Sequence, residues 1–181
     1  MAKKKQLFVG NLFDDVPMGN MPVFGLENRR YLGCKSKLAE WILSIINNEA
    51  QGAYSFFDIF AGTGAIGRKA LEYYQGVIFN VFLCSNVGSY KAFFADGELN
   101  KERVQDFIRE MNNVDASSLD GNYCSHYYGN KYFGMEAAKK IGYIRDEIER
   151  RKNEFSEKEY FVLVASLIYS ADRIANTPGQ F

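Results

Sequence analysis

The chain has 181 residues, of which 47% are hydrophobic, and its formal net charge at neutral pH is zero. This length and composition predict one folded domain with a core and exclude a disordered chain. A neutral chain has no overall attraction to nucleic acid, so any such interface must be a local patch. The three cysteines, Cys34, Cys84 and Cys124, have neither metal-binding nor disulfide-framework spacing, which favours a reducing cytoplasm. No apolar run is long enough to suggest a membrane span.

Residues 1–27 form an irregular lead-in that is rich in Gly, Pro, Asn and Met. Within it, residues 7–12 (LFVGNL) are similar to the first strand signature of an RNA-recognition motif. The second, aromatic signature that such a domain needs is absent from the sequence. We therefore expect residues 7–12 to be a short apolar segment that packs on the domain.

A first helix is predicted over residues 36–47. Its apolar residues recur at helical spacing on one face: Leu38, Trp41, Ile42, Ile45 and Ile46. Gly33 suits a sharp turn before this helix, and Ser36 is a suitable N-cap. Lys35 then lies at the start of the helix, where it can either hold a carboxylate or phosphate or simply be solvated.

The most informative stretch is a strand, a glycine-rich turn and a helix, predicted over residues 56–60, 61–67 and 68–74. This arrangement lets the backbone approach a ligand closely. Asp58 lies near the carboxyl end of the strand, where open α/β sheets bind ligands. The turn can belong to a nicotinamide dinucleotide site, to a methyltransferase cofactor site, or to a purely structural connection.

The dinucleotide alternative depends on Gly62, Gly64 and Gly67, which match the pattern G-x-G-x-x-G. That class also expects an acidic residue about 20 positions further on, after the next strand. The next strand is predicted over residues 77–83, and residues 84–86 (CSN) follow it without an acid. An NAD-binding oxidoreductase is therefore disfavoured.

Two motifs in order resemble the Dam-type DNA adenine-N6 methyltransferases: residues 30–38 (RYLGCKSKL) and residues 58–64 (DIFAGTG). The resemblance implies a Rossmann-like sheet that binds S-adenosylmethionine (AdoMet) and a flipped adenine presented to its methyl group. It also implies eight cofactor-binding residues: Tyr31, Gly33, Lys35, Asp58, Phe60, Gly62, Gly64 and Asn86. It assigns no catalytic residue and no metal ligand to this chain.

The resemblance gives several of these residues a role. Tyr31 is expected to pack on AdoMet, and Lys35 to contact its carboxylate end. Asp58, with the two glycines of the loop, is expected to surround the amino-acid part, because a carboxylate accepts hydrogen bonds from an ammonium group. Asn86 stands where the family has an acid that holds the ribose hydroxyls, and a neutral amide there predicts weaker cofactor binding.

The second half of the sequence predicts a mainly helical region. Helices are predicted over residues 98–112, 137–151 and 157–175, the last opened by a capping box from Ser156 to Glu159. Residues 114–134 are predicted to be a loop that is rich in Ser, Asn, Gly and Tyr and contains His126. Such a loop could touch DNA through aromatic stacking, although a lone histidine is usually just exposed.

Residues 132–145 resemble the helical insertion in one branch of the family. Ala137 and Gly142 stand where that branch carries Asn and Asp, which weakens the prediction of intact DNA contacts. The basic residues between 139 and 151 could follow a phosphate backbone, but acidic residues are interleaved with them. A mixed, solvated helix face is therefore an equally good interpretation.

The family's catalytic loop, Asp-Pro-Pro-Tyr, has no counterpart here, because the three prolines (Pro17, Pro22 and Pro178) are never adjacent. Only two strands are predicted, which is too few for a doubly wound sheet. We therefore expect a partial Rossmann-like methyltransferase fold with a helical insertion and its late strands missing. Its expected parts are a lead-in (1–27), an AdoMet-binding part (28–97), a helical insertion (98–175) and a truncated return to the sheet (176–181).

Two hypotheses about function remain open. The chain is either the AdoMet-binding portion of a site-specific, restriction-modification type DNA adenine methyltransferase, inactive alone, or a non-catalytic module that binds AdoMet, DNA or a partner. In the first case a second chain or a further segment supplies the catalytic loop. The coding DNA after the Phe181 codon distinguishes them, because an open frame that encodes Asp-Pro-Pro-Tyr supports the first hypothesis.

Overall fold

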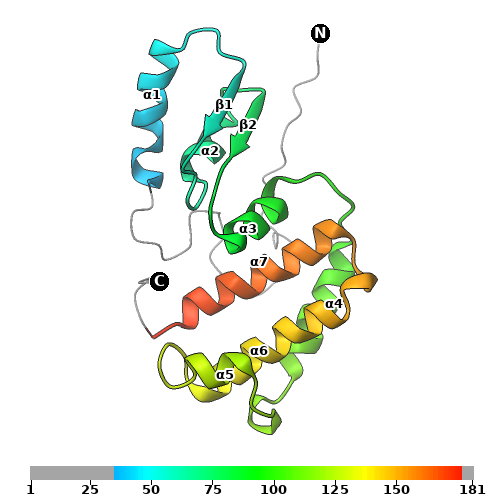
Figure 1. Ribbon diagram of the computed structural model, residues 1–181. Helices are drawn as coiled ribbons and strands as arrows, with labels where there is room; N and C mark the ends of the chain where they lie inside the picture. The colour runs from blue at the N-terminus through cyan, green and yellow to red at the C-terminus, as the bar shows by residue number, and fades with distance from the viewer. Residues whose placement is uncertain (1–34, 177–181) are drawn as a thin grey trace, which may run out of the picture.

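A computed structural model describes residues 35–176 of the chain, which form a mixed arrangement of helices and a small parallel sheet (Figure 1). The described elements are, in order, η2 (Ser36–Leu38), α1 (Ala39–Glu49), β1 (Ser55–Asp58), α2 (Ala65–Ala70), β2 (Gly76–Phe79), α3 (Cys84–Phe94), α4 (Lys101–Asn113), η3 (Ala116–Ser118), α5 (Tyr123–Tyr128), α6 (Met135–Arg150), η4 (Lys152–Glu154) and α7 (Glu157–Ile174). In this part of the chain no helix is long and apolar enough to cross a membrane.

The sheet consists of β1 and β2, which pair in parallel with Ser55 opposite Gly76 and Asp58 opposite Phe79. Both strands were predicted from sequence, but each is shorter than predicted. One face of the sheet is covered by α1 and α2 (Figure 1). The apolar side chains packed there come from both strands and both helices, and include Phe56, Val77, Leu43, Ala70 and Tyr74. An α/β fold with a parallel sheet is therefore confirmed at this coarse level.

The opposite face of the sheet is open in the described part of the chain. Phe57 and Ile78 lie side by side in register on this face, and their exposed fractions are 55% and 57%. Phe60 and Phe82, which follow the two strands, are even more exposed. Contiguous exposed apolar surface of this kind marks a face that another part of a protein or a ligand covers.

Helix α3 was not predicted from the sequence. The strand predicted over residues 77–83 ends at Phe79, and α3 begins at Cys84. The helix packs on two sides, so its apolar and small residues are not confined to one face. Tyr90 contacts Phe79 of β2, whereas Gly88 faces Phe161 of α7 closely enough that an added Cβ would lie 3.6 Å from that ring. Helical periodicity is weak when a helix is buried on opposite sides. In Figure 1, α3 accordingly lies between the sheet and α7.

Helices α4, α6 and α7 enclose the largest apolar cluster, which also receives Ala92 of α3. These helices match the three that were predicted, with bounds that differ by a few residues. The buried members of the cluster are Ala92, Val104, Phe107, Met111, Ile148, Val162, Leu163 and Ala165. Since α3 precedes residue 97 and packs on α7, contacts cross the predicted boundary between the two parts, and that boundary stays a prediction.

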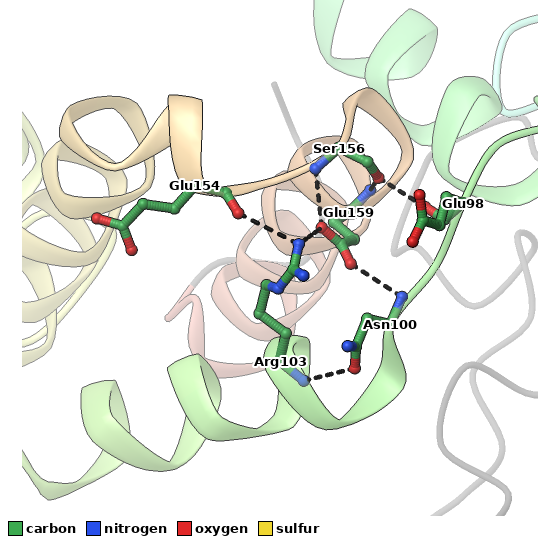
Figure 2. A network of polar contacts seen from close by, with 6 residues as sticks. All are labelled: Glu98, Asn100, Arg103, Glu154, Ser156 and Glu159. Carbon is green, nitrogen blue, oxygen red and sulfur yellow. Dashed lines mark hydrogen bonds and ion pairs between the residues drawn. The ribbon is translucent and has the colours of Figure 1, made fainter.

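A buried polar network joins the beginning of α4 to the beginning of α7 (Figure 2). The fully buried Glu159 accepts hydrogen bonds from the backbone N–H groups of Asn100 and Ser156, each at 2.8 Å, and pairs with Arg103 at 3.1 Å. Burial by itself would raise the pKa of Glu159, but the two backbone bonds and the Arg103 charge outweigh it and lower the pKa. The capping box from Ser156 to Glu159 is confirmed.

The prediction that residues 114–134 form a loop is wrong in part, because η3 and α5 lie inside it. Helix α5 is opened by a capping box in which Asn122 and Ser125 bond each other's backbone. His126 is therefore on a short helix. Gly142 of α6 packs so closely against Asn122 that a Cβ would overlap the amide group, so a larger residue there would have to displace this side chain.

Candidate functional site

Asp58 is the last residue of β1, in agreement with its predicted position near the carboxyl end of this strand, and it is half-buried. Burial raises the pKa of its carboxyl group, and hydrogen bonds with the backbone of Gly67 and Phe60, together with the charge of Lys35, act in the opposite direction. Lys35 and Asp58, which come from two separate motifs, are thus close enough to interact electrostatically. The pair would present one positive and one negative group to a zwitterionic ligand.

The turn after β1 uses two glycines in left-handed conformations. Gly62 has a φ of 55°, and Gly64, the N-cap of α2, has a φ of 82°. Residues with a Cβ rarely adopt such angles, so glycine is favoured at both positions. The Gly64 N–H donates to the carbonyl oxygen of Ala61 at 2.7 Å, which closes the turn. The sequence prediction of a tight glycine turn is therefore confirmed.

The third glycine, Gly67, serves a different purpose. A Cβ at this position would overlap the ring of Phe79, so α2 can approach β2 only because the side chain is absent. Helix α2 is also short, with six residues from Ala65 to Ala70. Gly67 is thus needed for packing between helix and strand.

Asn80 holds the turn from the β2 side. Its backbone N–H donates to the Asp58 carbonyl at 2.9 Å, and its carbonyl accepts from the Ala61 N–H at 3.0 Å. Its side-chain Nδ2 donates to the Ile59 carbonyl at 2.8 Å. Asn80 was not predicted as a site residue, since nothing in the local pattern distinguishes it from any polar residue after a strand.

Two residues of α3 hold the turn from the other side. The Nδ2 group of Asn86 and the hydroxyl of Tyr90 both donate to the Gly62 carbonyl oxygen, each at 2.6 Å. Asn86 was predicted to contact a ribose, but its exposed fraction is 2% and it lies against the glycine turn. The ribose contact stays a prediction. Tyr90 was not predicted, because its role depends on a helix that the sequence did not reveal.

The remaining predicted site residues that the structure describes do not take part in the hydrogen bonds that close the glycine turn. Phe60 is strongly exposed beside Asp58. Lys35 is exposed and is itself the N-cap of η2, without a side-chain capping bond, so the prediction of Ser36 as N-cap is wrong. The first helix begins as this 3₁₀ turn and becomes α1 only at Ala39. Tyr31 and Gly33 lie outside the described residues.

A second surface of interest is an open hollow of about 460 Å³ at α5 and the start of α6. The rings of Tyr123 and Tyr127 lie 4.5 Å apart at this hollow, and both are at least half exposed. His126, Met135 and Lys139 also line it, together with Gly121, Asn122 and Ser125. The Lys139 Nζ group donates to the Leu119 carbonyl at 2.7 Å, so this ammonium group already has a partner within the chain.

The small parallel sheet and the glycine turn at the end of its first strand define an α/β protein with a candidate site for a nucleotide-like ligand. Comparison with protein families narrows this class of α/β protein to one family. The profile described as D12 class N6 adenine-specific DNA methyltransferase matches residues 31–181, and the chain belongs to this family. The resemblance to DNA adenine-N6 methyltransferases seen in the sequence is confirmed.

Curated relatives support the same assignment. The chain is 33% identical to type II methyltransferase M.NlaIII of Neisseria lactamica over 168 residues, covering 83% of this chain and 47% of the relative. It is 33% identical to M.CviAII of Paramecium bursaria Chlorella virus 1 over 156 residues, covering 81% and 46% respectively. The chain thus spans about half the length of these relatives. No solved structure shows a significant match.

Proposed function

We propose that this chain is the AdoMet-binding portion of a site-specific DNA methyltransferase that transfers a methyl group to adenine N6. The observation that carries the proposal is the half-buried Asp58 carboxylate at the end of β1, beside a turn with two left-handed glycines. Family membership supports AdoMet as the ligand, and bound AdoMet would supply the methyl group.

The residues at the turn fit the charges of the amino-acid end of AdoMet. Burial makes the ionised form of Asp58 unfavourable, and an ammonium group that donates to this carboxylate would offset that cost. Lys35 supplies a positive charge for the ligand carboxylate. Without a Cβ at Gly62 or Gly64, the backbone can approach the ligand, and the exposed Phe60 ring offers an apolar surface nearby.

Equilibrium dialysis with labelled AdoMet tests this proposal. We expect the 181-residue chain to bind AdoMet and Asp58→Asn to bind more than about tenfold more weakly, because a charge-assisted hydrogen bond is lost. Asp106→Asn is the matched control, since Asp106 is an acid on the exposed side of α4 that pairs with Arg109. Unchanged binding by Asp58→Asn would remove Asp58 from the site.

We further propose that the aromatic hollow at α5 contacts the DNA substrate. Exposed tyrosine rings can stack on a base that has left the duplex. Tyr123→Ala should weaken binding to double-stranded oligonucleotides severalfold in an anisotropy titration. Tyr54→Ala is the control, because Tyr54 is about as exposed (68%, against 70% for Tyr123) but lies just before β1. Equal losses in the two variants would contradict the assignment.

Methyl transfer itself is proposed to need a segment from outside residues 1–181, in the same polypeptide or in a second chain. The sequence holds no Asp-Pro-Pro-Tyr loop, and the relatives are about twice as long as the matched part. The open face with Phe57 and Ile78 is the surface we expect that segment to cover. A chain that binds AdoMet but transfers no labelled methyl to DNA, even with the downstream-encoded segment, would instead be a non-catalytic module.

A further inference from the structure

We propose that Asn86 and Tyr90 are positioning residues that hold the glycine turn in its ligand-binding shape through one shared acceptor, the carbonyl oxygen of Gly62. This inference rests on the proposed AdoMet site, and it assigns to Asn86 a role that differs from direct contact with a ribose. It also adds Tyr90, which no motif indicated.

The geometry joins two elements that are far apart in sequence. Asn86 and Tyr90 lie four positions apart on α3, so their side chains are on the same helix face. Both donate to the Gly62 oxygen at 2.6 Å, and a carbonyl oxygen has two lone pairs with which to accept them. The two bonds therefore fill the hydrogen-bonding capacity of this oxygen.

Burial makes this double contact rigid. Both donors are buried, and the Tyr90 ring packs against Phe79 with its centroid 4.9 Å away and against Phe94 at 6.4 Å. A side chain held by packing cannot easily leave its acceptor. The acceptor belongs to a glycine with a φ of 55°, a residue whose backbone can adopt many other angles, so the two contacts restrict it to this one.

The turn is consequently fixed at both ends. Asn80 holds Ile59 and Ala61 from the β2 side, and α3 holds Gly62 from the other side. A turn fixed in advance loses little conformational entropy when a ligand binds, which favours affinity. This arrangement also gives a reason for an amide at position 86, because a carboxylate could not donate to the Gly62 carbonyl.

Three variants of the 181-residue chain separate positioning from general stability. Tyr90→Phe removes one hydroxyl donor and keeps the ring. Asn86→Asp replaces the other donor with an acceptor, yet it restores the acid that a ribose contact would use. Tyr74→Phe is the matched control, because the Tyr74 hydroxyl also makes a 2.6 Å bond, to Asn47, but in the cluster under α1 and α2.

The first readout is amide hydrogen exchange at Ala61 and Gly64, which needs no ligand. We expect exchange at these amides to accelerate roughly three- to tenfold in Tyr90→Phe and more in Asn86→Asp, with no change in Tyr74→Phe. Exchange in Tyr90→Phe that equals exchange in Tyr74→Phe would overturn the proposal. Because the exchange measurement uses no ligand, its result does not depend on whether the chain binds AdoMet.

The second readout is the dissociation constant for AdoMet in equilibrium dialysis. If wild type binds, we expect it to rise roughly three- to tenfold in Tyr90→Phe and more than about tenfold in Asn86→Asp, and to stay unchanged in Tyr74→Phe. Tighter binding by Asn86→Asp would show a direct ribose contact and overturn the positioning role. Absence of binding by wild type would contradict the proposed function, and the exchange result would then decide this inference alone.

Discussion

At the scale of single residues, the proposed AdoMet site depends on a carboxylate whose ionised form burial makes unfavourable. Asp58 is half-buried, and desolvation is the largest influence on its pKa, which lies above the usual value. The nearby Lys35 and two backbone bonds reduce this effect without removing it. A positively charged group of the ligand would stabilise the ionised carboxylate. The affinity for that ligand should therefore depend on the protonation state of Asp58.

AdoMet affinity should therefore fall at acid pH because of Asp58. As the pH falls through the raised pKa, the carboxyl group becomes protonated and no longer attracts the ammonium group of the ligand. Below that pKa the dissociation constant should rise by up to about tenfold per pH unit. Calorimetric titrations across the acid range would measure this change. Asp58→Asn should lack this dependence, and parallel pH profiles for wild type and variant would contradict the assignment.

The sequence predicted the glycine turn, because its candidate site residues follow a local spacing. Asp58, Gly62 and Gly64 lie within one short stretch at the end of β1. Asn86 and Tyr90 could not be given their observed contacts in this way. Their hydrogen bonds to Gly62 span 24 and 28 residues of sequence, so they exist only once α3 is packed on the sheet.

At the scale of elements, amphipathic helices were predictable and helices buried on two sides were not. Helices α4, α6 and α7 each turn one apolar face to a shared core, which gives a clear helical period. Helix α3 contacts both the glycine turn and α7, and the tyrosine-rich α5 shows no apolar stripe. The polar network at Glu159 then fixes how α4 and α7 begin relative to each other.

Glu159→Gln should destabilise the chain by about 1–3 kcal/mol at neutral pH, because the amide cannot reproduce the charged contacts to Arg103 and two backbone N–H groups. Since the folded-state pKa of Glu159 is lowered, its stabilisation is present above the unfolded pKa of about 4.3 and is lost as the pH falls through the folded value. Urea unfolding at both ends of this range measures the difference.

The surface variant Glu157→Gln serves as the control for this experiment. Glu157 pairs with Lys91 on the exposed side of α7 and should contribute little to stability. The stability gap between wild type and Glu159→Gln should narrow at acid pH. A gap that stays constant down to about pH 3 would show that the charge of Glu159 does not contribute to it.

At the scale of the whole molecule, the sheet is covered on one face and open on the other within residues 35–176. A two-stranded parallel sheet with an exposed apolar face is an incomplete unit, because parallel strands are normally covered on both sides. The sequence predicted the two strands that residues 35–176 contain, and the missing late strands stay a prediction. It did not predict which face would be open, since that depends on where α1 and α2 pack.

Neighbouring phenylalanines on β1 provide a direct test of this asymmetry. Phe56→Ala should destabilise the chain by about 2–4 kcal/mol, because Phe56 packs against Tyr74 with ring centroids 5.3 Å apart. Phe57→Ala should cost less than about 1 kcal/mol, since that ring lies on the open face. Urea unfolding compares the two variants. Equal losses would mean that the open face is covered in the folded chain.

A thermal melt with and without AdoMet tests most directly whether this chain holds AdoMet at the turn after β1. A ligand that binds only the folded form stabilises it by about 2.7 kcal/mol at a hundredfold excess over its dissociation constant. We predict a clear rise in the melting midpoint of the 181-residue chain and little or no rise for Asp58→Asn. A cooperative melt of the wild-type chain whose midpoint AdoMet does not change would contradict AdoMet binding by this chain.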